Sequence, residues 1–159
     1  MKVAIYPGSF KDWHAGHTDI LNKALKVFDK VIIARGMNPE KLKIYGESSL
    51  VAIGDLESAV DKALHGHTGQ VAVISYVGLL ADKVAQLNKQ YANPILAVIR
   101  GLRNAQDLCG EQIQQYYNED LGLKIPTVFF VADRKLVHIS SSANRVVEAF
   151  KNEDFSDTL

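Results

Sequence analysis

The sequence predicts an α/β fold in which helices cover both faces of a doubly wound, five-stranded parallel sheet. Short apolar runs alternate along the chain with amphipathic helical patterns, an order that favours parallel strands joined by right-handed crossovers. The strand runs are nearly continuous in apolar residues, as expected for strands buried on both faces. Because the chain has 159 residues and no linker-like segment, we expect a single domain over residues 1–159.

The first two predicted strands flank an amphipathic helix. Residues 3–6 form an apolar run that ends at a Pro-Gly-Ser breaker. A helical pattern starts near Gly16, and its apolar face consists of Ile20, Leu21, Ala24, Leu25 and Phe28. Residues 31–34 form the second strand, and the polar segment 35–43 is expected to be a loop.

The remaining strands and helices keep the same alternation. Further strands are expected at residues 71–76, 95–99 and 127–131. Helices are expected at residues 51–64 and 79–87, from Asn104 onward, and after the capping serines Ser140, Ser141 and Ser142. This succession of strand and helix predicts a Rossmann-like arrangement.

Composition and charge narrow the range of functions. The 18 basic residues balance the 18 acidic ones, so no general attraction to nucleic acid or to a membrane surface is expected. No apolar run reaches the length of a membrane span, and the N-terminus does not resemble a signal peptide. Cys109 is the single cysteine, and we expect it to be a small buried residue. A cytoplasmic protein is therefore expected.

Basic and hydroxyl side chains follow the predicted strands, at the edge where parallel sheets bind ligands. They include Ser9, Lys11, His14 and His17 after the first strand, Arg35 and Lys41 after the second, Arg100 and Arg103 after the fourth, and Arg134, His138 and the three serines after the fifth. The helices that begin near Gly16, Asn104 and Ser141 would direct their positive ends to the same edge. This edge is expected to bind an anionic ligand rich in phosphate.

The first motif joins YPGSF at residues 6–10 to HAGH at residues 14–17. Its glycines allow the backbone to approach a nucleotide closely, and His17 can donate hydrogen bonds to a phosphate as charge develops. The plainer interpretation is a capped turn with two solvated histidines. A zinc site that adds His65 and His67 is disfavoured because no companion ligand stands at a suitable spacing, so no metal ligands are assigned.

Three other features point to phosphate groups. Arg100 and Arg103 are three residues apart and can hold two phosphates, although a surface loop would also accommodate them. The serines of ISSS at residues 139–142 offer hydroxyls and free N–H groups at a helix start, or act as an ordinary cap. Lys41 can reach a phosphate from its loop, although most single lysines on loops are only solvated.

The motifs YPGSF, GHTDI, NPEK, RGLRNAQD and ISSS follow one another along the chain. In this order the chain resembles the bacterial phosphopantetheine adenylyltransferase family, from about residue 2 to residue 150. The resemblance implies an enzyme that transfers the adenylyl group of ATP to 4′-phosphopantetheine in coenzyme A biosynthesis, giving dephospho-coenzyme A and pyrophosphate. It also implies Mg²⁺ that arrives with ATP, and a homo-oligomer, usually a hexamer.

The resemblance also implies roles for individual residues. The catalytic residues would be His17, Lys41 and Arg100. The residues that bind ATP would be Ser9, Phe10, Gly16, His17, Arg103, Glu111, Ser140, Ser141 and Ser142. The residues that bind the acceptor would be Ser9, Lys41, Leu79, Leu80, Arg100 and Asn118.

The chain departs from the family pattern at several positions. Lys11-Asp12-Trp13 replaces a usual Asp-Pro, His14 stands where threonine is common, and Gly110 and Val146 replace a usual aromatic residue and a usual glutamate. Four other interpretations stay open. They are an adenylyltransferase with another acceptor such as nicotinamide mononucleotide, a cytidylyltransferase, a nucleotide-binding regulator without catalysis, and a nucleic-acid-binding module.

Overall fold

The computed structural model describes residues 1–40, 48–65 and 69–137, and the side chains of residues 48–53 are not part of that description. Within it, the strands β1 (Val3–Gly8), β2 (Lys30–Met37), β3 (Val71–Val77), β4 (Ile95–Leu102) and β5 (Thr127–Val131) form one sheet. All of the strand pairings are parallel, and the order is β3-β2-β1-β4-β5. The expected fold class is confirmed.

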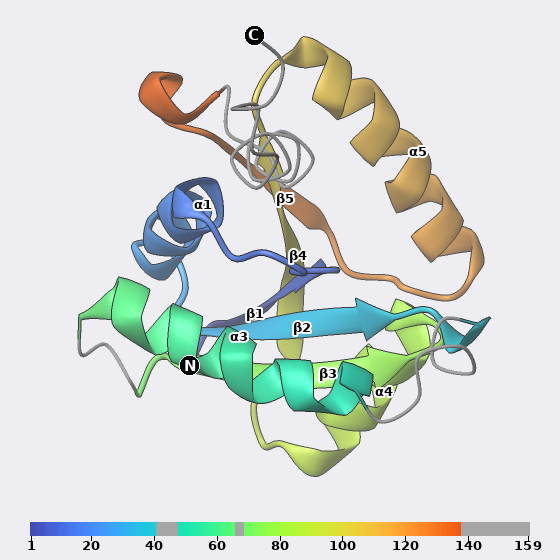
Figure 1. Ribbon diagram of the computed structural model, residues 1–159. Helices are drawn as coiled ribbons and strands as arrows, with labels where there is room; N and C mark the ends of the chain where they lie inside the picture. Colours follow the sequence, from blue (N-terminus) through green and yellow to red (C-terminus); the bar gives the residue numbers. More distant parts are fainter. Residues whose placement is uncertain (41–47, 66–68, 138–159) are drawn as a thin grey trace, which may run out of the picture.

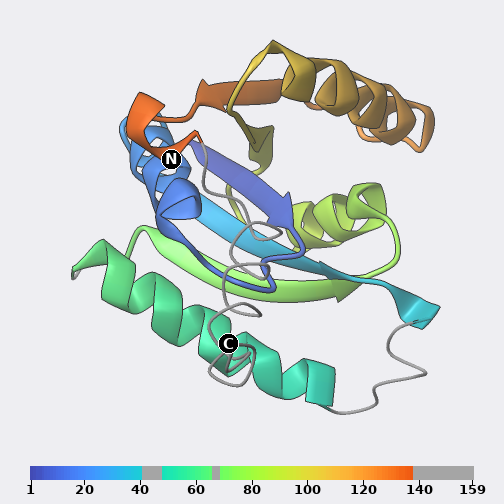
Figure 2. The ribbon, with the colours of Figure 1, turned by 45° about the horizontal axis from the view of Figure 1, so that its top comes forward.

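The helices lie on both faces of this sheet (Figures 1 and 2). They are α1 (Ala15–Leu25), α3 (Ser48–Leu64), α4 (Leu80–Gln90), α5 (Ala105–Asp120) and a short 3₁₀ helix, η1 (Arg134–Leu136). The helix expected after Ser140–Ser142 lies outside the described residues. None of the helices within the described part of the chain is long and apolar enough to cross a membrane.

The two faces of the sheet form separate cores because side chains alternate along each strand. Ala4 and Tyr6 of β1 pack with α1 and α3, while Val3 and Ile5 pack with α4. Ile20, Leu21 and Ala24 of α1 are buried in the first core, as their helical spacing predicts. β1 is the middle strand of the sheet and therefore contributes side chains to both cores.

Some predicted boundaries are wrong. β2 continues through Arg35 to Met37, which was expected to be a loop, because β3 pairs with it as far as Met37 and Val77. β4 continues past residue 99 to Leu102, since β5 pairs with it that far, so Arg100 lies within the strand. Cys109, expected to be buried, is exposed because none of the residues of α5 is buried.

The strand order creates a switch point between β1 and β4. The chain leaves β1 toward β2 on one side, and it leaves β4 toward β5 on the other. In open parallel sheets, ligands bind at the carboxyl ends of strands at such a point. Gly101 lets α1 lie close to β4 here, because a Cβ at this position would be 2.8 Å from Cγ1 of Ile20.

Candidate active site

A pocket of about 290 Å³ opens at this switch point. Five of the residues expected to bind ATP line it, namely Ser9, Phe10, Gly16, His17 and Arg103. Arg100 and His14 also contribute to its wall. The ends of β1 and β4 and the start of α1 thus bring together residues that the motifs place far apart in sequence.

A second pocket, of about 310 Å³, lies between α4 and α5. Leu79, Leu80 and Asn118, expected to bind the acceptor, line it together with Glu111. Ser9 and Arg100 line both pockets, so the two cavities meet at these residues. Glu111, which was expected among the ATP-binding residues, lines the second pocket. Lys41, Ser140, Ser141 and Ser142 lie outside the described residues.

The turn after β1 is shaped around an aromatic ring. Phe10 has a φ of 41°, an unusual backbone conformation for a bulky residue that costs on the order of 1 kcal/mol. The ring folds back over Gly8, where a Cβ would be 2.8 Å from Cζ of Phe10. It also meets the rings of Tyr6, Trp13 and His17, with centroids 5.1, 5.4 and 5.2 Å away. This cluster forms one wall for His17.

His14 and His17 cap the start of α1 reciprocally. The backbone N–H of His17 donates to Nδ1 of His14 at 3.4 Å, and the backbone N–H of His14 donates to Nδ1 of His17 at 3.4 Å. The rings stack with centroids 3.7 Å apart. Because each Nδ1 accepts, this network assigns the proton of each neutral ring to Nε2. Nε2 of His17 is therefore the hydrogen-bond donor of that ring.

His17 is held in its neutral form. Burial, the neighbouring His14 and the positive charge of Arg100 lower the pKa of His17 from 6.5 to about 3. Burial also lowers the pKa of His14. At neutral pH, His17 can thus stabilise a developing negative charge by donating a hydrogen bond, while it keeps its own proton.

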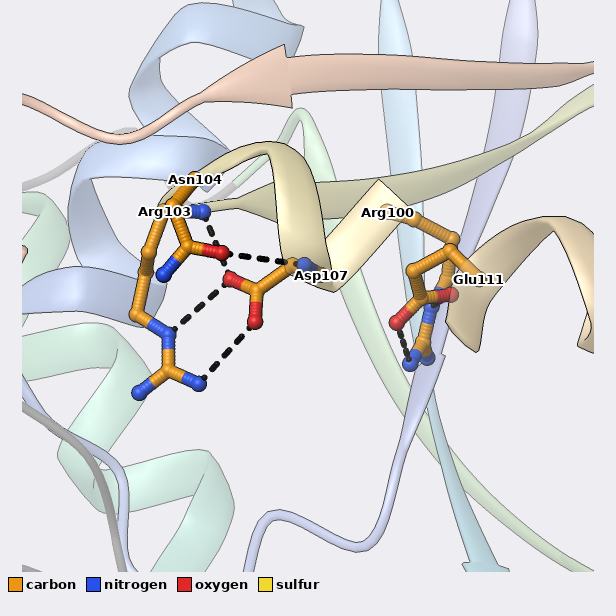
Figure 3. Close-up of polar contacts among 5 residues, drawn as sticks. All are labelled: Arg100, Arg103, Asn104, Asp107 and Glu111. Carbon is orange, nitrogen blue, oxygen red and sulfur yellow. Dashed lines mark hydrogen bonds and ion pairs between the residues drawn. The ribbon is translucent and has the colours of Figure 1, made fainter. Parts of the chain in front are cut away.

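Arg100 extends from β4 into a bidentate pair with Glu111 of α5 (Figure 3). Nε donates to Oε2 of Glu111 and Nη2 to Oε1, both at 2.7 Å, and Nη1 donates to the carbonyl of Pro7 at 2.7 Å. Burial by itself would lower the pKa of Arg100, but the hydrogen bonds and charge of Glu111 raise it above its usual value. Arg100 is therefore a fixed cation at the junction of the pockets.

Arg103 pairs with Asp107, in the first turn of α5 (Figure 3). Asp107 Oδ2 accepts from the backbone N–H of Arg103 at 2.8 Å and from its Nε at 3.1 Å, and Asn104 caps the helix by accepting from the N–H of Asp107. The hydrogen bond from the Arg103 side chain lowers the pKa of Asp107. The Arg103 side chain is more exposed than that of Arg100, at 43% against 31%.

An ion pair on α1 anchors the segment that follows β5. Asp19 Oδ2 accepts from Lys23 Nζ at 2.9 Å and from the backbone N–H of Asp133 at 2.8 Å. Lys23 Nζ also donates to the carbonyl of Val131 at 2.7 Å. These contacts hold the end of β5 against α1, which places Leu136 in the wall of the first pocket.

Sequence reasoning missed Tyr76 and Gln114, which line the second pocket. Tyr76 stands near the end of β3, so its place at the carboxyl edge was a usable signal. Gln114 lies on the turn of α5 that follows Glu111, and its polar character gave no sign that this face of the helix borders a cavity. Tyr76 and Gln114 reach the second pocket through tertiary packing and belong to no linear motif, unlike Ser9 and Arg100, which line it too.

The first pocket combines a helix N-terminus, a neutral histidine donor and two guanidinium groups, and its described lining contains no acidic side chain. Such a lining suits the phosphates of a nucleotide. Fold and site together define a Rossmann-like α/β protein of the nucleotidyltransferase class.

Comparisons with known proteins narrow that class. The family model described as cytidylyltransferase-like matches residues 5–147. The phosphopantetheine adenylyltransferase of Cytophaga hutchinsonii is 36% identical over 152 residues, which cover 96% of this chain and 93% of that protein. The phosphopantetheine adenylyltransferase of Brucella ovis is 33% identical, and the match covers 92% of this chain and 85% of that protein. The phosphopantetheine adenylyltransferase of Rhodopirellula baltica is 28% identical, and the match covers 96% of this chain and 78% of that protein. The chain therefore belongs to the cytidylyltransferase-like family and, within it, to the phosphopantetheine adenylyltransferase family.

Proposed function

We propose that the chain transfers the adenylyl group of ATP to 4′-phosphopantetheine, releasing pyrophosphate and forming dephospho-coenzyme A. One observation carries the proposal: the pocket at the start of α1 and the pocket between α4 and α5 meet at Ser9 and Arg100. A nucleotide in the first pocket and a phosphorylated acceptor in the second would meet at these residues. The names of the relatives support this assignment of donor and acceptor.

In the proposed reaction, a phosphate oxygen of the acceptor attacks the α-phosphorus of ATP in line. A new P–O bond forms, the bond between the α- and β-phosphates breaks, and its electron pair leaves with pyrophosphate. The enzyme forms no covalent intermediate, so catalysis consists of positioning and charge stabilisation. Nε2–H of neutral His17 would donate to an oxygen of the α-phosphoryl group as negative charge develops there.

The other residues divide between the two substrates. Arg100 and Ser9, which border both pockets, would orient the acceptor phosphate and the transferring group. Arg103 would hold the ATP phosphates, while Leu79, Leu80 and Asn118 would contact the pantetheine arm. By family resemblance, Lys41 would assist Arg100 and Ser140–Ser142 would border the nucleotide.

Magnesium would accompany ATP in this proposal. None of the described residues that line the first pocket is acidic, so this part of the lining offers no carboxylate ligand to the ion. Mg²⁺ commonly keeps several waters and binds through substrate phosphates. The lining therefore fits an ion that is bound by phosphate oxygens and water.

A homo-oligomer in the cytoplasm completes the proposal. Large apolar side chains of α5 face the solvent, among them Ile113 at 57% exposure and Tyr117 at 61%. Burying such a surface against further copies of the chain is favourable, and a hexamer is the state that the family resemblance implies. The exposed thiol of Cys109 suits a reducing compartment.

The test supplies ATP or CTP as donor, with Mg²⁺ and 4′-phosphopantetheine, and identifies the product by mass spectrometry. We expect dephospho-coenzyme A from ATP, and turnover with CTP that is lower by orders of magnitude. Product formation with CTP at a similar rate would instead indicate a cytidylyltransferase. Protein that binds ATP but forms no product would support a regulator that has lost catalysis.

A further inference from the structure

We propose that Glu111 is a positioning residue, which acts on the reaction only by fixing the guanidinium of Arg100 where the two pockets meet. This inference rests on the proposed function, since it names how one part of that site is held in place. It also differs from the role in ATP binding that the family resemblance implied for Glu111.

The contacts of Arg100 carry the inference. A guanidinium has five N–H donors in one plane. Glu111 accepts from Nε and Nη2, and Pro7 accepts from Nη1, each at 2.7 Å. Because these contacts fix the plane on three sides, the guanidinium cannot rotate without breaking charge-assisted hydrogen bonds. One N–H on each Nη is then left, in a fixed direction, for a phosphoryl oxygen.

The surroundings of Glu111 also favour this role. Both of its carboxylate oxygens accept from Arg100, and it lines the second pocket rather than the first. Its side chain is 18% exposed, so the pair is better shielded from water than a surface ion pair. ATP in the first pocket would have no free oxygen of this carboxylate facing it.

The neighbouring pair at the start of α5 shows the contrast. Arg103 and Asp107 are an i, i+4 pair in which the arginine side chain is 43% exposed, with longer side-chain contacts of 3.1 and 3.3 Å. Exposed pairs of this kind contribute little and open readily. One helix thus supplies a loose partner for Arg103 and a rigid partner for Arg100.

The expected result of Glu111→Gln follows from this geometry. Glutamine has one acceptor oxygen and presents an N–H₂ group to the other guanidinium donor, so the bidentate contact is lost. We expect kcat to fall about 10- to 100-fold, because a small misplacement of a positioned group has effects of this order. The Michaelis constant for the acceptor should not rise, because the charge of Arg100 is kept and its counter-charge is removed.

The kinetic experiment compares Glu111→Gln with Glu119→Gln, both checked for folding by circular dichroism. Glu119 is two turns further along α5, accepts from Gln115, and lies outside both pocket linings. We expect Glu119→Gln to behave as the unchanged protein. A raised Michaelis constant for ATP with unchanged kcat in Glu111→Gln would contradict the proposal, because it would indicate direct contact with ATP.

A double-mutant cycle with Arg100→Ala sharpens the test. If Glu111 acts only through Arg100, then adding Glu111→Gln to Arg100→Ala causes no further loss of kcat. A second, multiplicative loss in the double variant would overturn the proposal, since it would require a role for Glu111 that is independent of Arg100.

An NMR measurement keeps the test independent of turnover. In ¹⁵N-labelled protein, the Nε–H resonance of Arg100 should be protected from exchange in the unchanged protein and in Glu119→Gln, and should lose that protection in Glu111→Gln. Equal protection in all three proteins would contradict the proposal. If the unchanged protein forms no dephospho-coenzyme A, the proposed function fails, and this measurement still decides whether Glu111 fixes Arg100.

Discussion

His17 is the residue on which the proposed chemistry depends most directly. Its ring is half-buried beside Phe10 and Trp13, stacks on His14, and is neutral with Nε2 as the donor. A neutral donor gains most of its interaction energy when charge builds on the phosphoryl group, and therefore contributes to the transition state more than to binding of the substrate.

Replacing His17 by alanine should accordingly lower kcat by a factor of roughly 10² to 10³, the range seen when one donor to a developing charge is removed. The dissociation constant for ATP should change little, because the remaining contacts hold the triphosphate. Steady-state kinetics and calorimetry of ATP binding measure the two effects. Near-normal turnover in His17→Ala would remove His17 from the mechanism.

The protonation of His17 also predicts how stability depends on pH. The folded protein keeps the pKa of His17 at about 3, while an unfolded histidine takes up a proton near 6.5. Below about pH 6.5 the unfolded state therefore binds more protons than the folded state. The contribution of His17 to the free energy of unfolding is thus favourable to the folded state at higher pH, and this advantage is lost as the pH falls. The lowered pKa of His14 acts in the same direction.

Urea unfolding at pH 7.5 and pH 5 tests this prediction. The unfolding midpoint should fall at pH 5, and it should fall less in His17→Asn, which has no ring to protonate. NMR of the folded protein should show no titration of His17 between these two values. A ring that titrates near pH 6.5 would show that it is not held neutral.

At the scale of elements, the contact between α1 and β4 sets the shape of the first pocket. Gly101 of β4 faces Ile20 of α1 so closely that a Cβ would be 2.8 Å from Cγ1. Gly101→Ala should destabilise the protein by about 1–3 kcal/mol, as overpacking of a core does. It should also lower kcat, since α1 carries His17 into the pocket.

Gly54→Ala provides the matched control, since Gly54 lies within α3 and has no atom within 4 Å of an added Cβ. It should stabilise the protein by about 0.5–1 kcal/mol through helix propensity. Chemical denaturation measures both changes. Equal stability of Gly101→Ala and the unchanged protein would show that α1 can shift without cost.

The elements themselves were predictable from sequence because buried strands leave continuous apolar runs and helices leave a periodic face. Their ends were not, since β2 and β4 continue into polar residues such as Arg35 and Arg100. At these strand ends the backbone conformation is decided by pairing with the neighbouring strand, and the hydropathy of a single residue does not indicate that pairing. The wrong expectation for Cys109 has a similar cause, because α5 buries none of its residues.

At the scale of the whole molecule, α5 is a helix whose large apolar side chains the single chain leaves exposed. Its polar side chains Gln114, Gln115 and Asn118 line the second pocket, whereas Ile113 and Tyr117 are exposed. This distribution reverses the usual one, in which the apolar side faces inward. Further copies of the chain would cover the exposed apolar side chains.

Tyr117→Glu should therefore dissociate the proposed oligomer, because a carboxylate would have to be buried in the interface. Light scattering coupled to size-exclusion chromatography measures the mass, and circular dichroism checks the fold. Asp120→Asn, at the end of α5, is a control that should leave the mass unchanged. A Tyr117→Glu variant with the mass of the unchanged protein would place the interface elsewhere.

The motifs themselves predict the first pocket, whereas Leu79, Leu80 and Asn118 of the second pocket were predicted only through the family resemblance. Ser9, Gly16, His17 and Arg103 belong to linear motifs at strand ends, and parallel topology brings such ends together. Tyr76 and Gln114 reach the second pocket only through the packing of α4, α5 and β3 around it. The pairing of Arg100 with Glu111 is likewise tertiary, since it joins a strand to a helix eleven residues later.

The most direct test of the central claim is pyrophosphate release from ATP and Mg²⁺ with 4′-phosphopantetheine and nicotinamide mononucleotide supplied separately as acceptors. We predict release with 4′-phosphopantetheine and only background release with nicotinamide mononucleotide. Release with nicotinamide mononucleotide alone would contradict the assigned acceptor, although the nucleotide pocket would stand.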